Sequence, residues 1–240
     1  MIHICYSVSD NCELVGTSIQ SLLKNTCADV MIHLLHDSKL TAEDRIKFID
    51  LIRRFRQRIA FYDPNQLDKF PPDIPKIIYL DSKMLVDLDI SELWNLEIDK
   101  NLVAAVSSDK RFDVNLILIN LNQLRLQGRG DLIPRILNAI RRHEFSADRF
   151  LPLPEKFNTP IAKDFEHGKI YRFIETPKFS AEDPFNEQFT SYFIQTPFCT
   201  PESFGNFFNN KIHAFEQLKK STNEILNSIQ REIKSKTENP

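Results

Sequence analysis

The chain alternates short apolar runs with stretches in which apolar residues recur every three or four positions. The spacing predicts helices over residues 12–25 and from Thr41 onward, with Thr41 as the N-cap. An alternation of strands and helices is typical of an α/β layer with a mainly parallel sheet flanked by helices. Runs of strand length are Ile2–Val8, Val30–Leu35, Arg58–Tyr62, Lys76–Leu80, Leu102–Val106 and Leu116–Asn120. We expect this sheet to carry Ile4, Ile32, Ile78 and Leu118.

The last third of the chain has a different character. Beyond about residue 150 many prolines and phenylalanines interrupt the periodicity, and a polar helix with a narrow apolar stripe follows. We therefore expect three parts: an α/β domain over residues 1–150, an irregular aromatic-rich extension of that domain over 151–210, and an amphipathic helix over 211–240.

The segment Phe204–Phe208 and the terminal helix are the surface at which we expect a protein partner or a second copy of this chain. The phenylalanines give a large apolar area, which is typical of interaction sites when it is exposed. The alternative is a helix that packs on its own domain. The apolar stripe is too short to indicate a coiled coil.

Composition excludes several classes of protein. The 240 residues include 31 Lys+Arg and 33 Asp+Glu, so the chain lacks the basic surface of a nucleic-acid-binding protein. Only 5 residues are Gly, and no glycine-rich phosphate loop is present. We find no signal peptide and no apolar run near the roughly 18 residues of a membrane span. Four cysteines without a zinc spacing predict free thiols, and we expect a cytoplasmic protein, with peripheral contact at the inner face of the membrane left open.

The most informative segment is the run Ile77–Val86, which is followed by DLDISELW. An apolar strand ends in Asp81, and Lys83 stands two residues later. The stretch resembles the signature of the family 8 retaining glycosyltransferases, in which the strand ends in an Asp-x-Asp pair. In that family the pair holds a divalent cation against the diphosphate of a sugar nucleotide. The resemblance implies a GT-A-like (Rossmann-like) nucleotide-sugar-binding domain over residues 1–150 and a UDP-sugar as the donor.

The first strand and the loop after it resemble the nucleotide loop of the same family. The resemblance assigns Ser7, Ser9 and Asn11 to this loop, where the family contacts the uracil and the ribose. Asn11 matches the family pattern. Ser9 stands where the family has an Asp, and Cys12 stands where the family has a stacking Tyr.

Two later segments resemble further family motifs. The sequence FDVNLILINL from Phe112 resembles a strand whose Asn and Ser face the donor sugar; Asp113 and Val114 stand at those positions. The sequence RFIETPKFS from Arg172 aligns with a motif that supplies a metal-binding His and a phosphate-binding Lys. Arg172 takes the place of the His, and Lys178 keeps the Lys.

The substitution at Lys83 changes the chemistry that this position supports. Divalent cations on a diphosphate need hard oxygen ligands, and a lysine ammonium has no lone pair. At about 4 Å and an effective dielectric constant of about 20, two unit charges interact by some 4 kcal/mol, doubled for a divalent ion. We therefore predict that Mn²⁺ or Mg²⁺ binding is lost and assign no metal ligand. Lys83, Lys178 and Arg172 are alternative cations for a diphosphate. In the plainer interpretation, Lys83 is solvated and Asp81 caps a turn.

Two functions remain open. We favour a catalytically degenerate family-8-like pseudoenzyme of bacterial glycan assembly, acting as a subunit, scaffold or glycan-binding partner. Segments that bind the acceptor and the donor sugar in the family have no match here, and no catalytic residue can be assigned. The alternative is an active, metal-independent hexosyltransferase-type enzyme that uses a UDP-sugar, with Lys83 in place of the metal.

Overall fold

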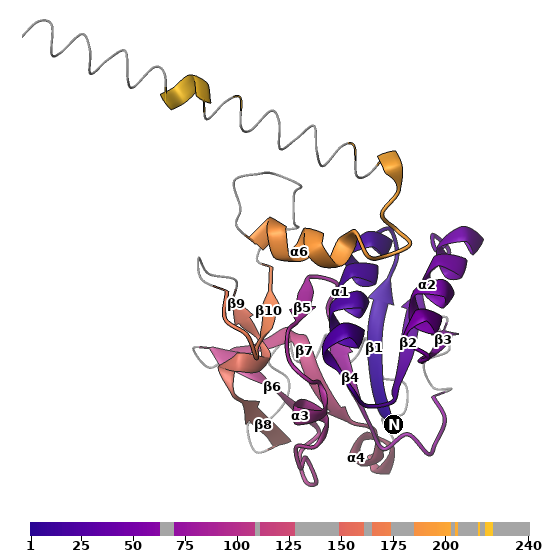
Figure 1. Cartoon of the computed structure of the whole chain (residues 1–240). Helices are drawn as coiled ribbons and strands as arrows, with labels where there is room; N and C mark the ends of the chain where they lie inside the picture. Colours follow the sequence, from indigo (N-terminus) through magenta and orange to yellow (C-terminus); the bar gives the residue numbers. More distant parts are fainter. Residues whose placement is uncertain are drawn as a thin grey trace, which may run out of the picture.

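The computed structural model describes residues 1–62, 70–108, 111–127, 149–160, 165–173 and 185–202, with a few positions beyond. They form a seven-stranded sheet in the order β3-β2-β1-β4-β7-β6-β8 and a three-stranded sheet in the order β5-β10-β9 (Figure 1). The strands are β1 (Ile2–Val8), β2 (Val30–His36), β3 (Arg58–Tyr62), β4 (Lys76–Leu80), β5 (Met84–Val86), β6 (Val103–Ser108), β7 (Arg111–Asn120), β8 (Phe150–Leu153), β9 (Thr159–Pro160) and β10 (Ile170–Arg172). The helices are α1 (Cys12–Asn25), α2 (Ala42–Arg54), α3 (Ser91–Trp94), α4 (Leu121–Leu126) and α6 (Phe185–Phe193), with a 3-10 turn at Glu155–Phe157.

The large sheet is mainly parallel, as predicted. Strand β1 runs parallel to β2 and β4, β2 to β3, and β6 to β8, whereas β7 is antiparallel to β4 and β6. The four residues expected in the sheet are all in it, and they form one row: Ile4 lies opposite Ile32 and Ile78, and Ile78 lies opposite Leu118. All four side chains are fully buried.

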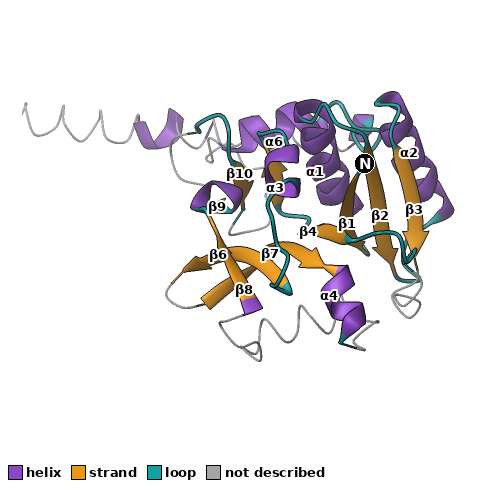
Figure 2. Cartoon of the chain, turned by 90° about the horizontal axis from the view of Figure 1, so that it is seen from below, coloured by secondary structure: helices purple, strands orange, loops and turns teal. Residues whose placement is uncertain are grey.

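The strands are apolar on both faces because each face packs against its own core. Along β1, Ile4 and Tyr6 belong to one cluster of buried residues and Cys5 belongs to the other, as the alternation of side chains in a strand requires. Helices α1, α2 and α6 lie on one side of the large sheet, and α4 lies on the other (Figure 2). Helix α2 begins as predicted, because Thr41 Oγ1 accepts a hydrogen bond from the Asp44 backbone N–H at 3.0 Å.

The C-terminal extension crosses back over the first helix. Strand β10 pairs antiparallel with β5 and parallel with β9, and α6 packs on α1. The chain after α6 brings the buried ring of Phe198 against Gly16 of α1. The aromatic-rich region thus contributes short strands and a helix to the same body as the sheet.

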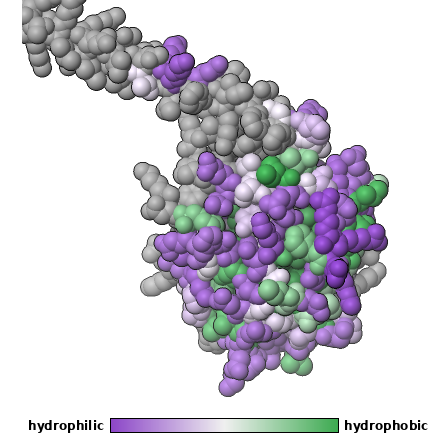
Figure 3. Space-filling model, viewed as in Figure 1, coloured by the Kyte–Doolittle hydropathy of each residue, from purple (hydrophilic) through white to green (hydrophobic). Residues whose placement is uncertain are grey.

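Several expectations fall on residues that are not described. Lys178 lies outside the described residues, as do Phe204–Phe208 apart from Gly205 and most of the chain from residue 211 onward. In the part that is described, no helix is long and apolar enough to cross a bilayer. The face seen in Figure 3 is mainly hydrophilic, with small apolar groups scattered over it.

Candidate functional site

A cavity of about 710 Å³ lies beside the carboxyl ends of β1 and β4. Parallel α/β sheets bind ligands at this edge because the loops after neighbouring strands converge there. Four segments supply the walls: the loop from β1 into α1, the connection from β2 into α2, the turn between β4 and β5, and α6. The lining residues are Ser9, Asp10, Asn11, Cys12, Glu13, Leu14, Lys39, Asp44, Ser82, Lys83 and Phe189.

The loop after β1 is ordered by hydrogen bonds among its own polar groups and to the end of β2. The Ser9 backbone N–H donates to Asn11 Oδ1 at 2.9 Å, and Ser9 Oγ donates to Asp37 Oδ2 at 2.7 Å. The hydrogen bond from Ser9, with a second from the Lys39 backbone N–H, holds the pKa of the Asp37 carboxyl below its usual value. Asp37 therefore places a carboxylate beside Ser9, which itself replaces an Asp of the family pattern.

Cys12 lines the cavity but is not an activated nucleophile. Burial raises the pKa of its thiol to about 11, so the thiol stays protonated near neutral pH. Cys12 Sγ also donates to the Ser9 carbonyl oxygen at 3.6 Å. Its contribution to the wall is therefore steric and weakly polar.

The turn between β4 and β5 presents Lys83 to the cavity and turns Asp81 toward its own backbone. Asp81 Oδ1 accepts a hydrogen bond from the Lys83 N–H at 2.9 Å, an Asx-type turn. The Asp81 N–H donates to the Asn115 carbonyl oxygen of β7 at 2.7 Å. Ser82 and Lys83 are among the lining residues and Asp81 is not.

An ion pair behind this turn joins two positions that are far apart in the sequence. Arg172 Nη1 lies 3.2 Å from Asp113 Oδ2, and both side chains are partly buried. Asp113 Oδ1 also accepts hydrogen bonds from the backbone N–H and side-chain amide of Asn115, at 2.9 and 2.6 Å. The Phe173 N–H donates to the Lys83 carbonyl oxygen at 2.9 Å, which fixes the end of β10 beside the turn. Two cationic side chains, Lys83 and Arg172, therefore come from adjoining segments.

These residues do not form a donor set for a divalent cation. Lys83 and Arg172 carry no lone pair for a metal, and Asp113 is already engaged by Arg172 and Asn115. Among the residues that the structure describes, no group of three or more His, Cys, Asp or Glu side chains is placed to hold a metal ion. That the chain binds no Mn²⁺ or Mg²⁺ stays a prediction for experiment.

Comparison with known proteins identifies the relatives of this architecture. The model of glycosyl transferase family 8 matches residues 66–169. The resemblance to this family is confirmed. No curated protein matches the chain.

Solved glycosyltransferase structures share the fold at low sequence identity. The bifunctional glycosyltransferase WbbM aligns at a TM-score of 0.72 and 16% identity, over 88% of this chain and 52% of its own. An active-site mutant of LgtC aligns at a TM-score of 0.67 and 14% identity, over 85% of this chain and 99% of its own. GlyE of Streptococcus pneumoniae TIGR4 aligns at a TM-score of 0.65 and 16% identity, over 81% of this chain and 60% of its own. This chain thus spans about half the length of WbbM and has the GT-A fold of these enzymes.

The structure brings together some of the residues assigned from the family resemblance. Ser9, Asn11 and Lys83 line the cavity, whereas Ser7 is exposed on β1 and is not among the lining residues. Asp81 belongs to the same turn as Lys83, and Asp113 lies on β7; neither is among the lining residues. Their roles in binding stay predictions.

Sequence reasoning did not identify Asp37, Glu13 or Phe189 as part of the site. Asp37 reaches Ser9 only through the pairing of β1 with β2. Phe189 reaches the cavity only because α6 crosses α1. Glu13 could have been found from the sequence, since it directly follows the loop that the family resemblance assigns to the nucleotide.

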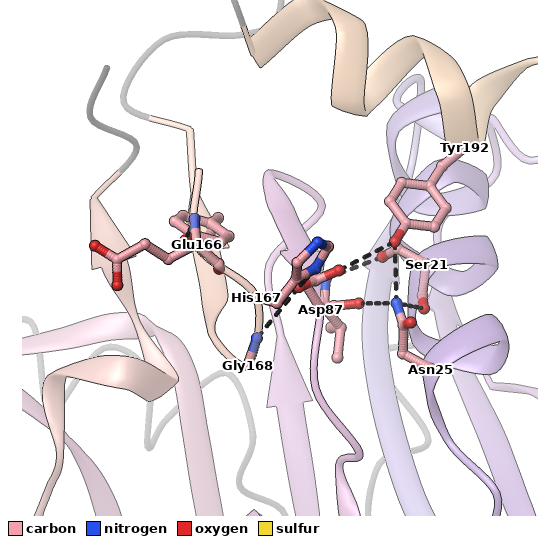
Figure 4. A network of polar contacts seen from close by, with 9 residues as sticks. Ser21, Asn25, Asp87, Glu166, His167, Gly168 and Tyr192 are labelled. Carbon is pink, nitrogen blue, oxygen red and sulfur yellow. Dashed lines mark hydrogen bonds and ion pairs between the residues drawn. The ribbon is translucent and has the colours of Figure 1, made fainter. Parts of the chain in front are cut away.

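A second polar network holds α6 in place (Figure 4). At its centre is Asp87, whose side chain is only 8% exposed and accepts hydrogen bonds from His167 Nδ1 at 2.9 Å and the Gly168 N–H at 3.2 Å. Tyr192 of α6 donates to the other Asp87 oxygen at 3.5 Å, and Asn25 of α1 lies 3.0 Å from the Tyr192 hydroxyl. The network joins α6 to α1 and to the small sheet, and so positions the helix that carries Phe189.

Proposed function

We propose that this chain is a glycosyltransferase-family-8-like protein that holds a nucleotide or nucleotide sugar in the cavity without a divalent cation. We further propose that it serves glycan assembly as a catalytically degenerate subunit, scaffold or glycan-binding partner. One observation carries the proposal: Lys83 lines the cavity, and the Arg172–Asp113 ion pair adjoins its turn, at positions where the family resemblance has a metal ligand and donor-sugar contacts. A diphosphate there would meet fixed cations in place of a metal ion.

The degenerate state is supported by how the polar groups are engaged. Transfer of a sugar needs side chains that contact the reacting carbon or its leaving group, and these have to be free to do so. Asp113 is held by Arg172 and Asn115, Asp81 accepts from its own turn, and Cys12 is protonated. Within the described residues we assign no group to nucleophilic or acid–base chemistry.

A second candidate function is a metal-independent transferase. The observation that favours it is that Lys83 lines the cavity and, within the part of the chain that the structure describes, makes no ion pair. A fixed ammonium beside a leaving diphosphate stabilises the developing negative charge, as a metal ion does. Release of UDP from a UDP-sugar by the wild-type chain, abolished in Lys83→Gln, would favour this candidate over the degenerate one.

Binding of UDP should depend on Lys83 and not on a metal. We expect calorimetry to give the same affinity for UDP in EDTA and in Mn²⁺, and a loss of about tenfold in Lys83→Gln, because a charge-assisted contact is removed. Lys100→Gln is the matched control, since Lys100 is exposed in a turn and does not line the cavity. Absence of UDP binding, or binding that EDTA abolishes, would contradict the proposal.

Restoring a metal site should require two substitutions. In Lys83→Asp the Arg172 guanidinium still lies at the end of β10 beside the turn, so we expect no Mn²⁺ binding. In Lys83→Asp combined with Arg172→His, two cations are replaced by groups with lone pairs, and we expect weak but measurable binding by electron paramagnetic resonance. Tight Mn²⁺ binding by the wild-type chain that disappears in Asp81→Ala would refute the predicted loss.

A further inference from the structure

The charged side chains in the cavity wall differ in whether another described residue pairs with them. Asp10 pairs with Lys39 at 3.2 Å and Asp44 accepts from Thr41 Oγ1 at 2.6 Å. Within the described residues, the side chains of Glu13 and Lys83 make no ion pair and no hydrogen bond. The cavity therefore offers one carboxylate and one ammonium group to whatever occupies it.

The two groups come from different walls of the cavity. Glu13 lies in the first turn of α1, and Lys83 lies in the turn between β4 and β5. The charge of Lys47 acts on Glu13, but Lys47 forms its ion pair with Glu43, at 2.8 Å. Partial burial raises the pKa of the Glu13 carboxyl, and Lys47 opposes this only in part. A carboxylate in such a place gains from a hydrogen-bond donor on a ligand.

A structural explanation for Glu13 also exists. An acidic residue in the first turn of a helix stabilises the helix through the positive end of its dipole. Glu43 has the same place in α2, but it is paired with Lys47 and does not line the cavity. The comparison between these two glutamates therefore separates a role in the helix from a role in binding.

We infer that Glu13 is a specificity-determining residue, which accepts a hydrogen bond from the nucleoside part of a nucleoside diphosphate whose anionic end lies at Lys83. The inference rests on the proposed function. A nucleoside supplies base N–H and ribose hydroxyl donors, and these match a carboxylate acceptor. A diphosphate without a nucleoside has nothing to offer Glu13 and is repelled by it. Glu13 thus selects the nucleotide over the bare diphosphate.

The test compares UDP with pyrophosphate by calorimetry in EDTA at pH 8, on the full chain. In Glu13→Gln we expect the affinity for UDP to fall about tenfold, because a charged acceptor is lost, and the affinity for pyrophosphate to rise a few-fold, because a like charge is removed. Glu13→Asp keeps the charge but shortens the side chain, so it should lower the affinity for UDP without raising the affinity for pyrophosphate. Glu43→Gln should change neither affinity.

The outcomes separate this inference from the proposed function. Lys83→Gln should lower the affinity for both UDP and pyrophosphate, whether or not Glu13 contacts the nucleoside. If the wild-type chain binds UDP but Glu13→Gln leaves the UDP affinity unchanged or raises it, Glu13 acts only in the helix and the inference is overturned while the proposed function stands. If the wild-type chain binds neither ligand, both are overturned. Thermal unfolding of each variant confirms that a loss of affinity is not a loss of fold.

Discussion

Acidification from pH 7 to pH 5 is expected to lower the free energy of unfolding by about 2 kcal/mol through His33 alone. Burial, with a smaller contribution from the neighbouring His3, lowers the pKa of His33 from 6.5 to about 3 in the folded chain. The unfolded chain takes up a proton at His33 below about pH 6.5 and the folded chain does not. Stability from this group is therefore complete above pH 6.5 and is lost as the pH falls toward 3.

The structure explains why a charged imidazole is excluded there. His33 is 1% exposed, and its Nε2 lies 2.9 Å from His3 Nδ1, so one proton is shared between the two rings. On its other side, His33 Nδ1 lies 3.2 Å from the Tyr62 hydroxyl. Burial also lowers the pKa of His3, so protonation of His3 opposes folding in the same direction. The pair is thus held neutral at the junction of three parallel strands.

Urea unfolding between pH 8 and pH 5 measures the effect. We expect the free energy of unfolding to fall by up to about 1.4 kcal/mol per pH unit below 6.5 for each neutral buried histidine. His33→Phe should remove that group's share of the pH dependence, whatever it does to stability at pH 8. His36→Gln is the control, because His36 lies partly exposed at the end of β2. The same slope in His33→Phe and in the wild-type chain would show that His33 does not carry the effect.

The sequence alone was sufficient to predict the strands and helices that have a long hydrophobic pattern and that pack against elements close to them in the chain. Strands Ile2–Val8 and Lys76–Leu80 are nearly continuous apolar runs because both faces of the sheet are covered. The helix over residues 12–25 has a clear apolar face, and Thr41 is a strong N-cap signal. The fold class followed from these elements and from the motif after Lys76.

Short elements that depend on distant partners were not predictable in the same way. Strands Met84–Val86 and Ile170–Arg172 have three residues each, too few to show a periodicity, and they exist because they pair with each other. The same pairing brings the end of β10 beside Lys83, and only then can Arg172 meet Asp113. The sequence identified Lys83 and Asp113 as candidates, but their relation to Arg172 is a product of the tertiary structure.

Replacement of Gly16 by alanine is expected to destabilise the chain by about 2 kcal/mol, although alanine is normally preferred in a helix. In an exposed helix the change gains about 1 kcal/mol. At Gly16 a Cβ would lie 2.5 Å from Cδ2 and 2.7 Å from Cε2 of Phe198. The Phe198 ring is buried, with its centroid 4.7 Å from that of Phe48, so it has little room to move. Overpacking typically costs about 1–3 kcal/mol. The 2.5 Å approach to a buried ring puts Gly16→Ala at the upper end of this range, so a net loss of about 2 kcal/mol remains after the gain in helix propensity.

The partner substitution makes this prediction specific to one contact. Phe198→Leu alone should lower stability, because it leaves a cavity over Gly16. Gly16→Ala in the Phe198→Leu background should be neutral or stabilising, since the added methyl group then fills space and improves helix propensity. A higher unfolding temperature for Gly16→Ala in the otherwise wild-type chain would contradict the close packing of the two. The segment after α6 is held at this contact, and α6 carries Phe189 into the cavity wall. Gly16→Ala should therefore also weaken UDP binding. Adding Phe198→Leu to Gly16→Ala should restore part of the lost affinity.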